Sequence, residues 1–205
     1  MSPRPRKVSD DDVFMAMQRA MSRLGPGELT LAEIAAEAGV TAGALVQRFG
    51  SKRELLLALS ERFSSGTKEM FTALRTANGS PLAALRAYGD CISGLATSPE
   101  ALARNLSYLQ IDLTDPDLRK QLVAQARASR AELQLIINDA IAAGELARAT
   151  NPTRLARTVE AILGGSMMSW AYYEEGPATQ WMRDDLEAVL APYLTKNMKR
   201  KRSYG

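Results

Sequence analysis

The stretch TLAEIAAEAGVTAGALVQRF at residues 30–49, followed by GSKRELL at residues 50–56, contains three consecutive helix starts. Thr30 and Ser51 are each followed three residues later by a glutamate, which is typical of a capping box that closes the first turn of a helix. Thr41 is suited to cap the short helix between them, because its hydroxyl can accept a hydrogen bond from a first-turn N–H group. The stretch therefore predicts three helices joined by short, fixed turns.

The turn between the first two of these helices has the residue types of a helix-turn-helix unit. Ala35 is small where the helices must cross closely, and Gly39 can adopt the positive φ of a tight turn. The second helix of such a unit, here residues 41–48, enters the DNA major groove with its N-terminal residues toward the bases, while its first N–H groups and hydroxyls can bind phosphate. The apolar wedge of the unit is predicted to consist of Ile34, Val40, Leu45 and Phe49.

The rest of the chain also repeats apolar residues at helical spacing, and sustained alternation of period two is missing. Several helices are predicted to begin where a capping residue precedes proline at the first helical position. The fold class is therefore predicted to be all-α, with a three-helix N-terminal head and a six-helix C-terminal body. The expected helices are residues 10–24, 31–38, 42–48, 52–76, 81–97, 99–112, 116–143, 152–173 and 178–194.

The charge of the chain is unevenly distributed. Eight of the 26 basic side chains fall in residues 1–7 and 196–205, which leaves 18 basic against 23 acidic side chains and a formal charge of −5 for the part between. Basic ends suit a polyanion such as DNA, but charged termini also serve as solubilising tails, and both interpretations stay open here. The basic residues of the two ends are Arg4, Arg6, Lys7, Lys196, Lys199, Arg200, Lys201 and Arg202.

The composition also disfavours several classes of protein. A single cysteine, Cys91, leaves no internal disulfide, and no long apolar run predicts a membrane span or a signal peptide, so we expect a cytoplasmic protein. The chain has no histidine, which removes the usual general base and the commonest metal ligand. No metal spacing or phosphate loop is present, and we expect no catalytic residues, no metal and no cofactor.

The head, the Phe-Gly-Ser-Lys turn at residues 49–52 and the long helix that follows it resemble the tetracycline-repressor (TetR) family of bacterial regulators throughout residues 10–60. The last two long helices look like the dimerisation pair of that family. The resemblance implies a homodimer that binds double-stranded operator DNA, a ligand cavity in the body, and repression that a small molecule relieves. It also implies a helix-turn-helix domain at 1–50, a ligand-binding and dimerisation domain at 51–195, and a basic tail at 196–205.

The family's DNA-contacting positions can be carried over residue by residue. Val46 stands where the family usually has a phosphate-binding tyrosine, and it can make only apolar contact. Arg48 stands where a histidine is common, and its five donors could replace the missing contact or reach a guanine edge. The complete predicted DNA-binding set is Thr30, Thr41, Ala42, Gly43, Ala44, Val46, Gln47, Arg48 and Lys52.

Two further sets of residues are predicted from the body. Apolar stripes on the last two helices predict a dimer interface, although part of each stripe must pack inside the subunit; the set is Leu155, Val159, Ile162, Gly165, Trp181, Leu186, Val189, Leu190 and Tyr193. Soft and amphipathic side chains predict a site for a mostly apolar, neutral or weakly cationic ligand, although such residues at helical spacing are also typical of plain core. That set is Met70, Tyr88, Cys91, Asn105, Tyr108, Met167, Trp170 and Tyr173.

Two other functions compete with a DNA-binding regulator. One is an all-α enzyme that acts on a small apolar substrate, which the missing histidine and the lack of a nucleophile motif disfavour. The other is an adaptor whose helix-turn-helix contacts protein and whose basic ends bind an acidic partner. Binding to promoter DNA would separate both alternatives from the regulator.

Overall fold

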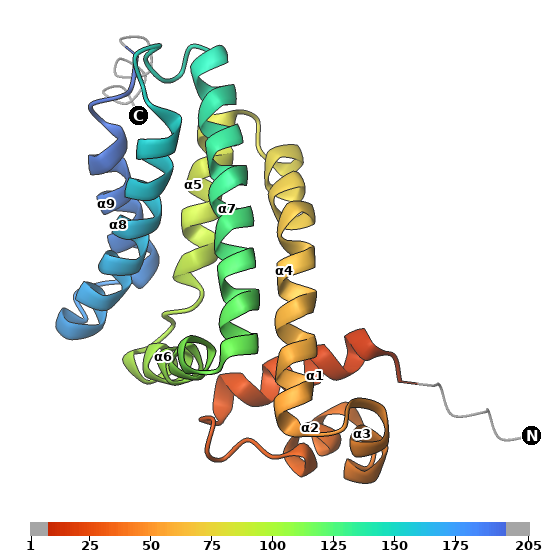
Figure 1. The fold of residues 1–205 in the computed structure, drawn as a ribbon. Coiled ribbons are helices and arrows are strands. Elements are labelled where there is room, and N and C mark those ends of the chain that lie inside the picture. Colours follow the sequence, from red (N-terminus) through yellow and green to blue (C-terminus); the bar gives the residue numbers. More distant parts are fainter. Residues whose placement is uncertain (1–7, 196–205) are drawn as a thin grey trace, which may run out of the picture. The chain divides into compact units, whose positions relative to one another are not determined.

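The computed structural model describes residues 8–195 and confirms the all-α prediction (Figure 1). Every helix predicted from the sequence is present, and most ends agree within one or two residues. No helix in this range is both long and apolar enough to cross a membrane. The helices are α1 (Asp10–Arg23), α2 (Leu31–Ala38), α3 (Ala42–Phe49), α4 (Lys52–Ala77), α5 (Pro81–Ser93), α6 (Pro99–Thr114), α7 (Pro116–Ala142), α8 (Pro152–Tyr173) and α9 (Ala178–Leu190).

Two helices end about one turn earlier than the apolar pattern predicts. After α5, the N–H groups of residues 94–96 bond to carbonyls three residues back, which tightens the chain into short turns. After α9, Thr195 N–H donates to the Glu145 carbonyl at 3.1 Å, and Ala147 N–H donates to the Tyr193 carbonyl at 2.8 Å. These bonds flank an antiparallel bridge between Leu146 and Leu194. Because the residues after α9 pair with this distant extended segment, they do not continue the helix.

The chain forms two compact units that interleave along the sequence. One contains the residues up to Phe63 together with Ala103–Leu122, and the other contains Ser64–Leu102 together with the residues from Val123 onward. The end of α6 and the start of α7 therefore belong to the same unit as the head. The linear division into domains at residues 1–50 and 51–195 stays a prediction, and the basic tail at 196–205 lies outside the described residues.

The unit that contains the head has one apolar core, built mainly from α1, α2, α3 and the first turns of α4. On its surface Glu37 accepts a hydrogen bond from Arg19 Nε at 2.7 Å and pairs with Arg23. The Arg19 hydrogen bond and the two positive charges lower the pKa of Glu37. The buried core residues are Val13, Met17, Ala20, Leu29, Ile34, Ala35, Leu45, Leu55, Leu56, Leu59, Tyr108 and Leu118.

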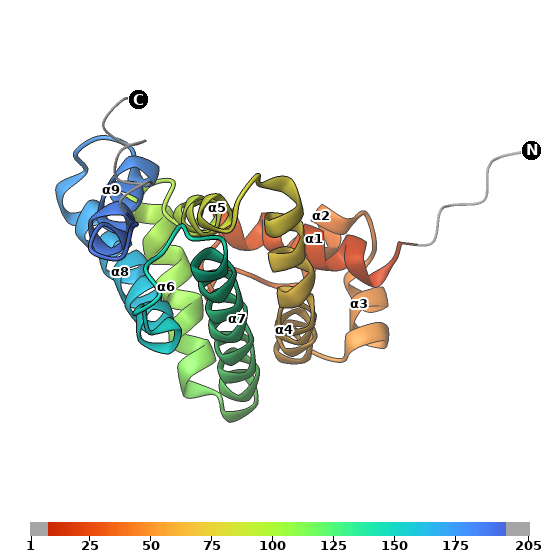
Figure 2. The ribbon, with the colours of Figure 1, turned by 90° about the horizontal axis from the view of Figure 1, so that it is seen from above.

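The other unit packs α5, α8 and α9 with the remaining parts of α4 and α7. Figure 2 shows α8 and α9 side by side, and Ser166 of α8 donates to Asp185 of α9 at 2.6 Å. Arg86 of α5 forms a half-buried ion pair with Glu187 of α9. Phe71 stacks on Tyr88 with ring centroids 5.0 Å apart. The largest fully buried side chains of this core are Phe71, Leu82, Leu85, Leu133, Ile136 and Ile137.

Candidate nucleic-acid interface

The turn between α2 and α3 has the geometry predicted for a helix-turn-helix. The Thr30 hydroxyl accepts a hydrogen bond from Glu33 N–H at 3.1 Å, and the Thr41 hydroxyl accepts one from Ala44 N–H at 3.1 Å. Gly39 ends α2 with φ 70°, in the left-handed region that favours glycine. The predicted caps and the predicted positive φ are therefore confirmed, and they fix where α3 begins.

Helix α3 has one buried side chain, and most of its other residues are exposed. Leu45 is 1% exposed, whereas its neighbour Val46 is 50% exposed. Ala42 and Phe49 are half-buried and complete the side that faces the core. The predicted DNA-contacting residues of this helix, apart from Ala42, lie on its exposed surface together with the capping residue; they are Thr41, Gly43, Ala44, Val46, Gln47 and Arg48.

Arg48 is already engaged within the head. Its Nη1 donates to the Val8 carbonyl at 2.8 Å, and its guanidinium forms an ion pair with Asp10. The guanidinium also lies 5.3 Å from the centre of the Phe49 ring, and Phe49 packs against Phe14 of α1. Arg48 therefore ties the last turn of α3 to the start of α1, a role that the residue pattern of α3 did not predict.

Lys52 is also turned toward the protein. Its ammonium group donates to the carbonyls of Pro26 and Leu29, at 2.9 and 2.8 Å, and the side chain is half-buried. An ammonium group has three N–H donors, so two of the three hold the turn between α1 and α2. The structure thus gives Lys52 an internal role, and the DNA contact that the family resemblance implies for it stays a prediction.

The part of α6 and α7 in this unit bonds to the two helices that flank the helix-turn-helix, α1 and α4. The Tyr108 hydroxyl donates to the Leu24 carbonyl at 2.8 Å, and Arg104 Nε donates to the Ser22 carbonyl at 3.0 Å. Burial raises the pKa of Tyr108 to about 12. Tyr108, predicted to contact ligand, is thus occupied in holding the end of α1.

A second tie of the same segment involves the start of α4. Arg53 donates two hydrogen bonds to Asp115, at 2.6 and 2.8 Å, and one to Asp117 at 2.6 Å. Asp115 also caps α7, because it accepts from Leu118 N–H at 3.2 Å. The Arg53 hydrogen bonds hold the pKa of Asp115 below its ordinary value. Sequence reasoning missed this tie, since 62 residues separate its two partners.

The predicted ligand residues are divided between the two units. Asn105 and Tyr108 belong to the unit of the head, and the other six belong to the second unit. There Tyr88 is buried against Phe71, whereas Trp170 Nε1 donates to the Gly176 carbonyl at 2.9 Å in a smaller apolar cluster. The remaining four include the exposed residues Met70, Cys91 and Tyr173 and the half-buried residue Met167.

The predicted dimer residues divide into two groups. Leu155, Val159, Leu186 and Leu190 are buried in the core of their own unit, so they have no surface left for a partner, and for these four the prediction is wrong. They are buried because α8 and α9 pack on α5 and on each other, which consumes the most apolar side of each helix. Ile162, Trp181, Val189 and Tyr193 are half-buried, and Gly165 is exposed.

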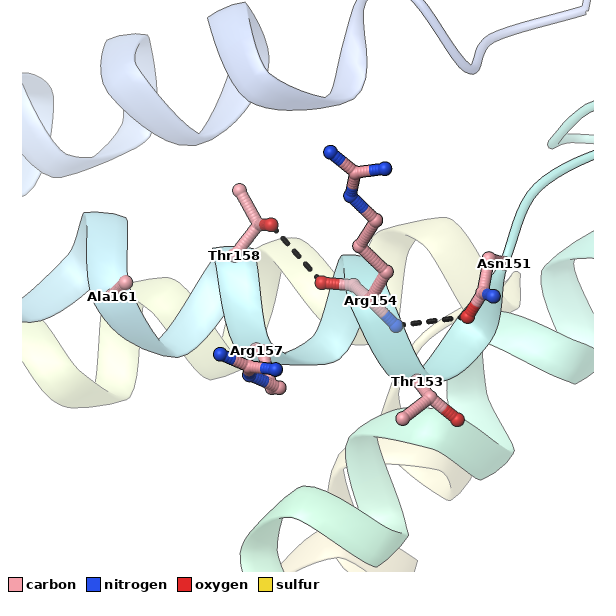
Figure 3. Close-up of a pocket in the computed structure, with 6 residues that line it drawn as sticks. All are labelled: Asn151, Thr153, Arg154, Arg157, Thr158 and Ala161. Atoms are coloured by element: carbon pink, nitrogen blue, oxygen red, sulfur yellow. Dashed lines mark hydrogen bonds between the residues drawn. The ribbon is translucent and has the colours of Figure 1, made fainter.

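A pocket of about 520 Å³ lies at the start of α8 (Figure 3). Arg154 and Thr158 project from the same side of the helix in this view, and the Thr158 hydroxyl donates to the Arg154 carbonyl at 3.0 Å. The lining is polar and basic, unlike the apolar site predicted for a ligand, and contains none of the residues of that prediction. It consists of Asn151, Thr153, Arg154, Arg157, Thr158 and Ala161.

Two family models match the sequence. Residues 18–59 match "Bacterial regulatory proteins, tetR family", and residues 108–186 match "Tetracyclin repressor-like, C-terminal domain". Together these matches span more than half of the 205 residues. No curated protein matches the sequence.

Several solved structures share the fold. SmeT, the repressor of the Stenotrophomonas maltophilia multidrug efflux pump SmeDEF, is 22% identical, with 94% of this chain and 93% of SmeT covered and a TM-score of 0.65. The Bacillus subtilis regulator FadR in complex with stearoyl-CoA is 16% identical, with 89% and 98% covered and a TM-score of 0.67. A Saccharomonospora viridis regulator in complex with choline is 16% identical, with 91% and 98% covered and a TM-score of 0.71.

Proposed function

The chain belongs to the TetR family of bacterial transcriptional regulators, and we propose that it is a homodimeric repressor that places α3 of each subunit in the major groove and leaves its operator when a small molecule binds. Membership of this family makes the chain a DNA-binding regulator and not an enzyme. We place its action in the cytoplasm, where bacterial DNA lies.

The exposed surface of α3 is the observation that carries the proposal. Gly43 and Ala44 are small and lie in the first turn, so they allow the helix to approach base edges closely. The Gln47 amide is exposed and suited to bond an adenine edge with both its donor and its acceptor. Val46 can contact a thymine methyl group. This surface therefore offers both polar and apolar contacts to bases.

Phosphate contacts are proposed for the two capping threonines. Each hydroxyl accepts a hydrogen bond from its own helix, and a hydroxyl that accepts can still donate its hydrogen to a phosphate oxygen. Thr30 and Thr41 stand at helix N-termini, where the helix dipole favours negative charge. These contacts would fix the position of α3 in the groove without reading sequence.

For the dimer we propose the outward side of α8 in place of the stripe predicted from the sequence. Ala161 and Gly165 are exposed there, and their small size permits close approach of a partner helix. An isologous dimer would bind a pseudo-palindromic operator whose half-sites lie roughly 34–36 Å apart, or a multiple of that distance. Light scattering should give twice the subunit mass of 22.3 kDa, and that subunit mass itself at micromolar concentration would contradict a dimer.

The ligand remains a proposal of class only. The related structures include one with stearoyl-CoA and one with choline, a large acyl thioester and a small cation. Such different chemistry among proteins of one fold gives no guide to the ligand of this chain. We keep the prediction of a mostly apolar, neutral or weakly cationic molecule, to be tested by thermal shift and by release of DNA in a compound screen.

DNA binding can be tested with the promoter region of the protein's own gene in a fluorescence anisotropy titration. Gln47→Ala should weaken specific binding by about 1–3 kcal/mol if the amide contacts a base with both groups. Gln110→Ala is a matched control, because Gln110 is exposed on α6 and loses the same amide. Equal affinity of both variants and the wild type would remove Gln47 from the interface, and no DNA binding by the wild type would contradict the proposal itself.

A further inference from the structure

Asp112 on α6 differs from every other aspartate of the chain. All ten aspartates lie in the described residues, and nine of them accept a hydrogen bond or form an ion pair there. Asp112 has neither kind of partner within residues 8–195. Its carboxylate is nevertheless half-buried, and burial raises its pKa because it disfavours the charged form. A carboxylate that loses water without gaining a partner is unfavourable for the folded protein.

Three exposed leucines lie beside Asp112 on the same side of α6. Leu106, Leu109 and Leu113 follow one another at spacings of three and four residues, which places them in one row along the helix. Asp112 comes three residues after Leu109, so it lies at the edge of this row. Each leucine is at least 36% exposed. A group of neighbouring exposed apolar side chains is typical of a binding surface, and we call these four residues the α6 surface.

The α6 surface belongs to the same compact unit as the head. A different side of the same helical turns holds the end of α1. There Tyr108 is buried and donates to the Leu24 carbonyl, and Arg104 donates to the Ser22 carbonyl. A molecule bound to the α6 surface would therefore contact the helical segment that bonds to the head.

The carboxylate and the leucines together define the chemistry of the molecule that fits this surface. An anion would be repelled by Asp112. A neutral apolar molecule would cover the leucines and exclude more water from the carboxylate, but it would give the carboxylate no partner. A positively charged group with N–H donors would compensate the lost hydration, because hydrogen bonds between ionised partners are stronger than neutral ones.

We propose that the α6 surface binds a cationic amphipathic small molecule, whose positive group pairs with Asp112 and whose apolar part covers Leu106, Leu109 and Leu113. The proposal rests on the proposed ligand-responsive function and narrows its ligand from neutral or weakly cationic molecules to cations. Asp112 destabilises the protein while the surface is empty, and the bound cation offsets this effect.

Three probes that share one unbranched carbon chain separate charge from apolar contact: decylammonium, decanol and decanoate. Their binding to the full chain is measured by isothermal titration calorimetry at neutral pH, below the concentration at which they form micelles. Decylammonium should bind roughly tenfold more tightly than decanol, which is the usual effect of a hydrogen bond to a charged group, and decanoate should bind most weakly. Equal affinities for decylammonium and decanol, or tightest binding of decanoate, would overturn the proposal.

Asp112→Asn and Asp184→Asn remove the same charge at two places. Asp184 is exposed on α9, in the other unit, and is the matched control. Asp112→Asn should bind decylammonium about tenfold more weakly than the wild type and decanol within about twofold of it, whereas the control should bind all three probes as the wild type does. Circular dichroism should show that Asp112→Asn is folded and at least as stable as the wild type. A preference for decylammonium that persists in Asp112→Asn would overturn the proposal.

Leu113→Ala and Leu135→Ala remove the same apolar side chain at similar exposure, 53% on α6 and 50% on α7. Leu113→Ala should weaken the binding of all three probes by a similar factor of roughly two to five, because it removes apolar contact and no charge. Leu135→Ala should leave all three affinities at their wild-type values. Equal effects of the two leucine variants would overturn the assignment of binding to the α6 surface.

Release of operator DNA distinguishes a failure of this proposal from a failure of the proposed function. Decylammonium should lower the fluorescence anisotropy of labelled operator in the presence of the wild type, but not in the presence of Asp112→Asn. A wild type that binds no operator would contradict the proposed function, while the calorimetry would still decide the α6 surface. Binding of decylammonium as predicted without release of DNA would support the α6 surface and contradict relief of repression by its ligand.

Discussion

Leu45 and Val46 are adjacent on α3 but have opposite surroundings, and exchanging each for alanine should affect different properties. Leu45 is 1% exposed and is the only buried side chain of α3. Leu45→Ala removes three carbon groups worth about 0.8 kcal/mol each when buried, and the cavity left behind brings the usual cost to about 2–5 kcal/mol. Small domains have a total stability of only about 5–15 kcal/mol, so a loss of this size should destabilise the whole head.

Val46→Ala should leave stability almost unchanged. Val46 is 50% exposed, and exposed substitutions usually change the free energy of unfolding by less than about 0.5 kcal/mol. Alanine is also the better helix former, which offsets part of the packing that the smaller side chain gives up. The same substitution should weaken operator binding, because it removes the apolar side chain that the exposed surface of α3 presents to the groove.

The assay pairs urea unfolding, followed by circular dichroism, with anisotropy titrations on operator DNA at a temperature where both variants are folded. The expected pattern is crossed: Leu45→Ala lowers the unfolding free energy, and Val46→Ala lowers DNA affinity at unchanged stability. Equal destabilisation by the two substitutions would refute the burial argument. Wild-type DNA affinity of Val46→Ala would refute the assignment of this side of α3 to DNA.

Three further substitutions test local features of the structure. Gly50 has φ 86°, and a side chain at this position would also contact the Glu54 carboxylate. Gly50→Ala should therefore lower the free energy of unfolding by roughly 1–3 kcal/mol. If adding Glu54→Ala restored the full loss, backbone strain would play no part. Asp112 is half-buried, and burial raises its pKa because it disfavours the charged carboxylate. Asp112→Asn should therefore raise the melting temperature at pH 7, and this gain should shrink as the pH falls through the raised pKa. A gain that did not depend on pH would contradict this cause. Arg53 lowers the pKa of Asp115, so the stabilising effect of this carboxylate is fully present at neutral pH, begins to weaken below about pH 4, and is lost as the pH falls through the lowered pKa. Asp115→Asn should therefore destabilise less at pH 3 than at pH 7, and an equal effect at both pH values would exclude the ion pair.

The helices and their starts were predictable because their signals are local. A capping side chain bonds to an N–H group three residues away, as Ser80 and Asn151 do ahead of Pro81 and Pro152. The positive φ of Gly39 follows in the same way from the short turn in which it lies. The predicted end of α9 was wrong because a distant contact decides it: the bridge between Leu146 and Leu194 joins segments 48 residues apart.

The position of the candidate DNA surface could be predicted from the sequence, but the partners of its charged side chains could not. That α3 exposes Thr41 and Gln47 follows from the helical spacing around the buried Leu45. That Arg48 and Lys52 turn toward the protein does not, because their partners at Val8 and Pro26 lie 40 and 26 residues away. A sequence gives the donors of a side chain, but which acceptors come within hydrogen-bond distance depends on how the helices pack.

The sequence by itself determined the fold class, the helix-turn-helix and the family, because periodicity, caps and glycine conformation act within a few residues along the chain. Only the tertiary structure decided which apolar stripe of α8 and α9 is core: Leu155 and Leu186 are buried within their own unit, while Gly165 remains exposed. An apolar stripe in the sequence shows that one side of a helix is apolar, but it does not show which neighbouring element covers that side. That choice follows from the packing of elements distant in sequence, where burial of each side chain competes with burial of all the others.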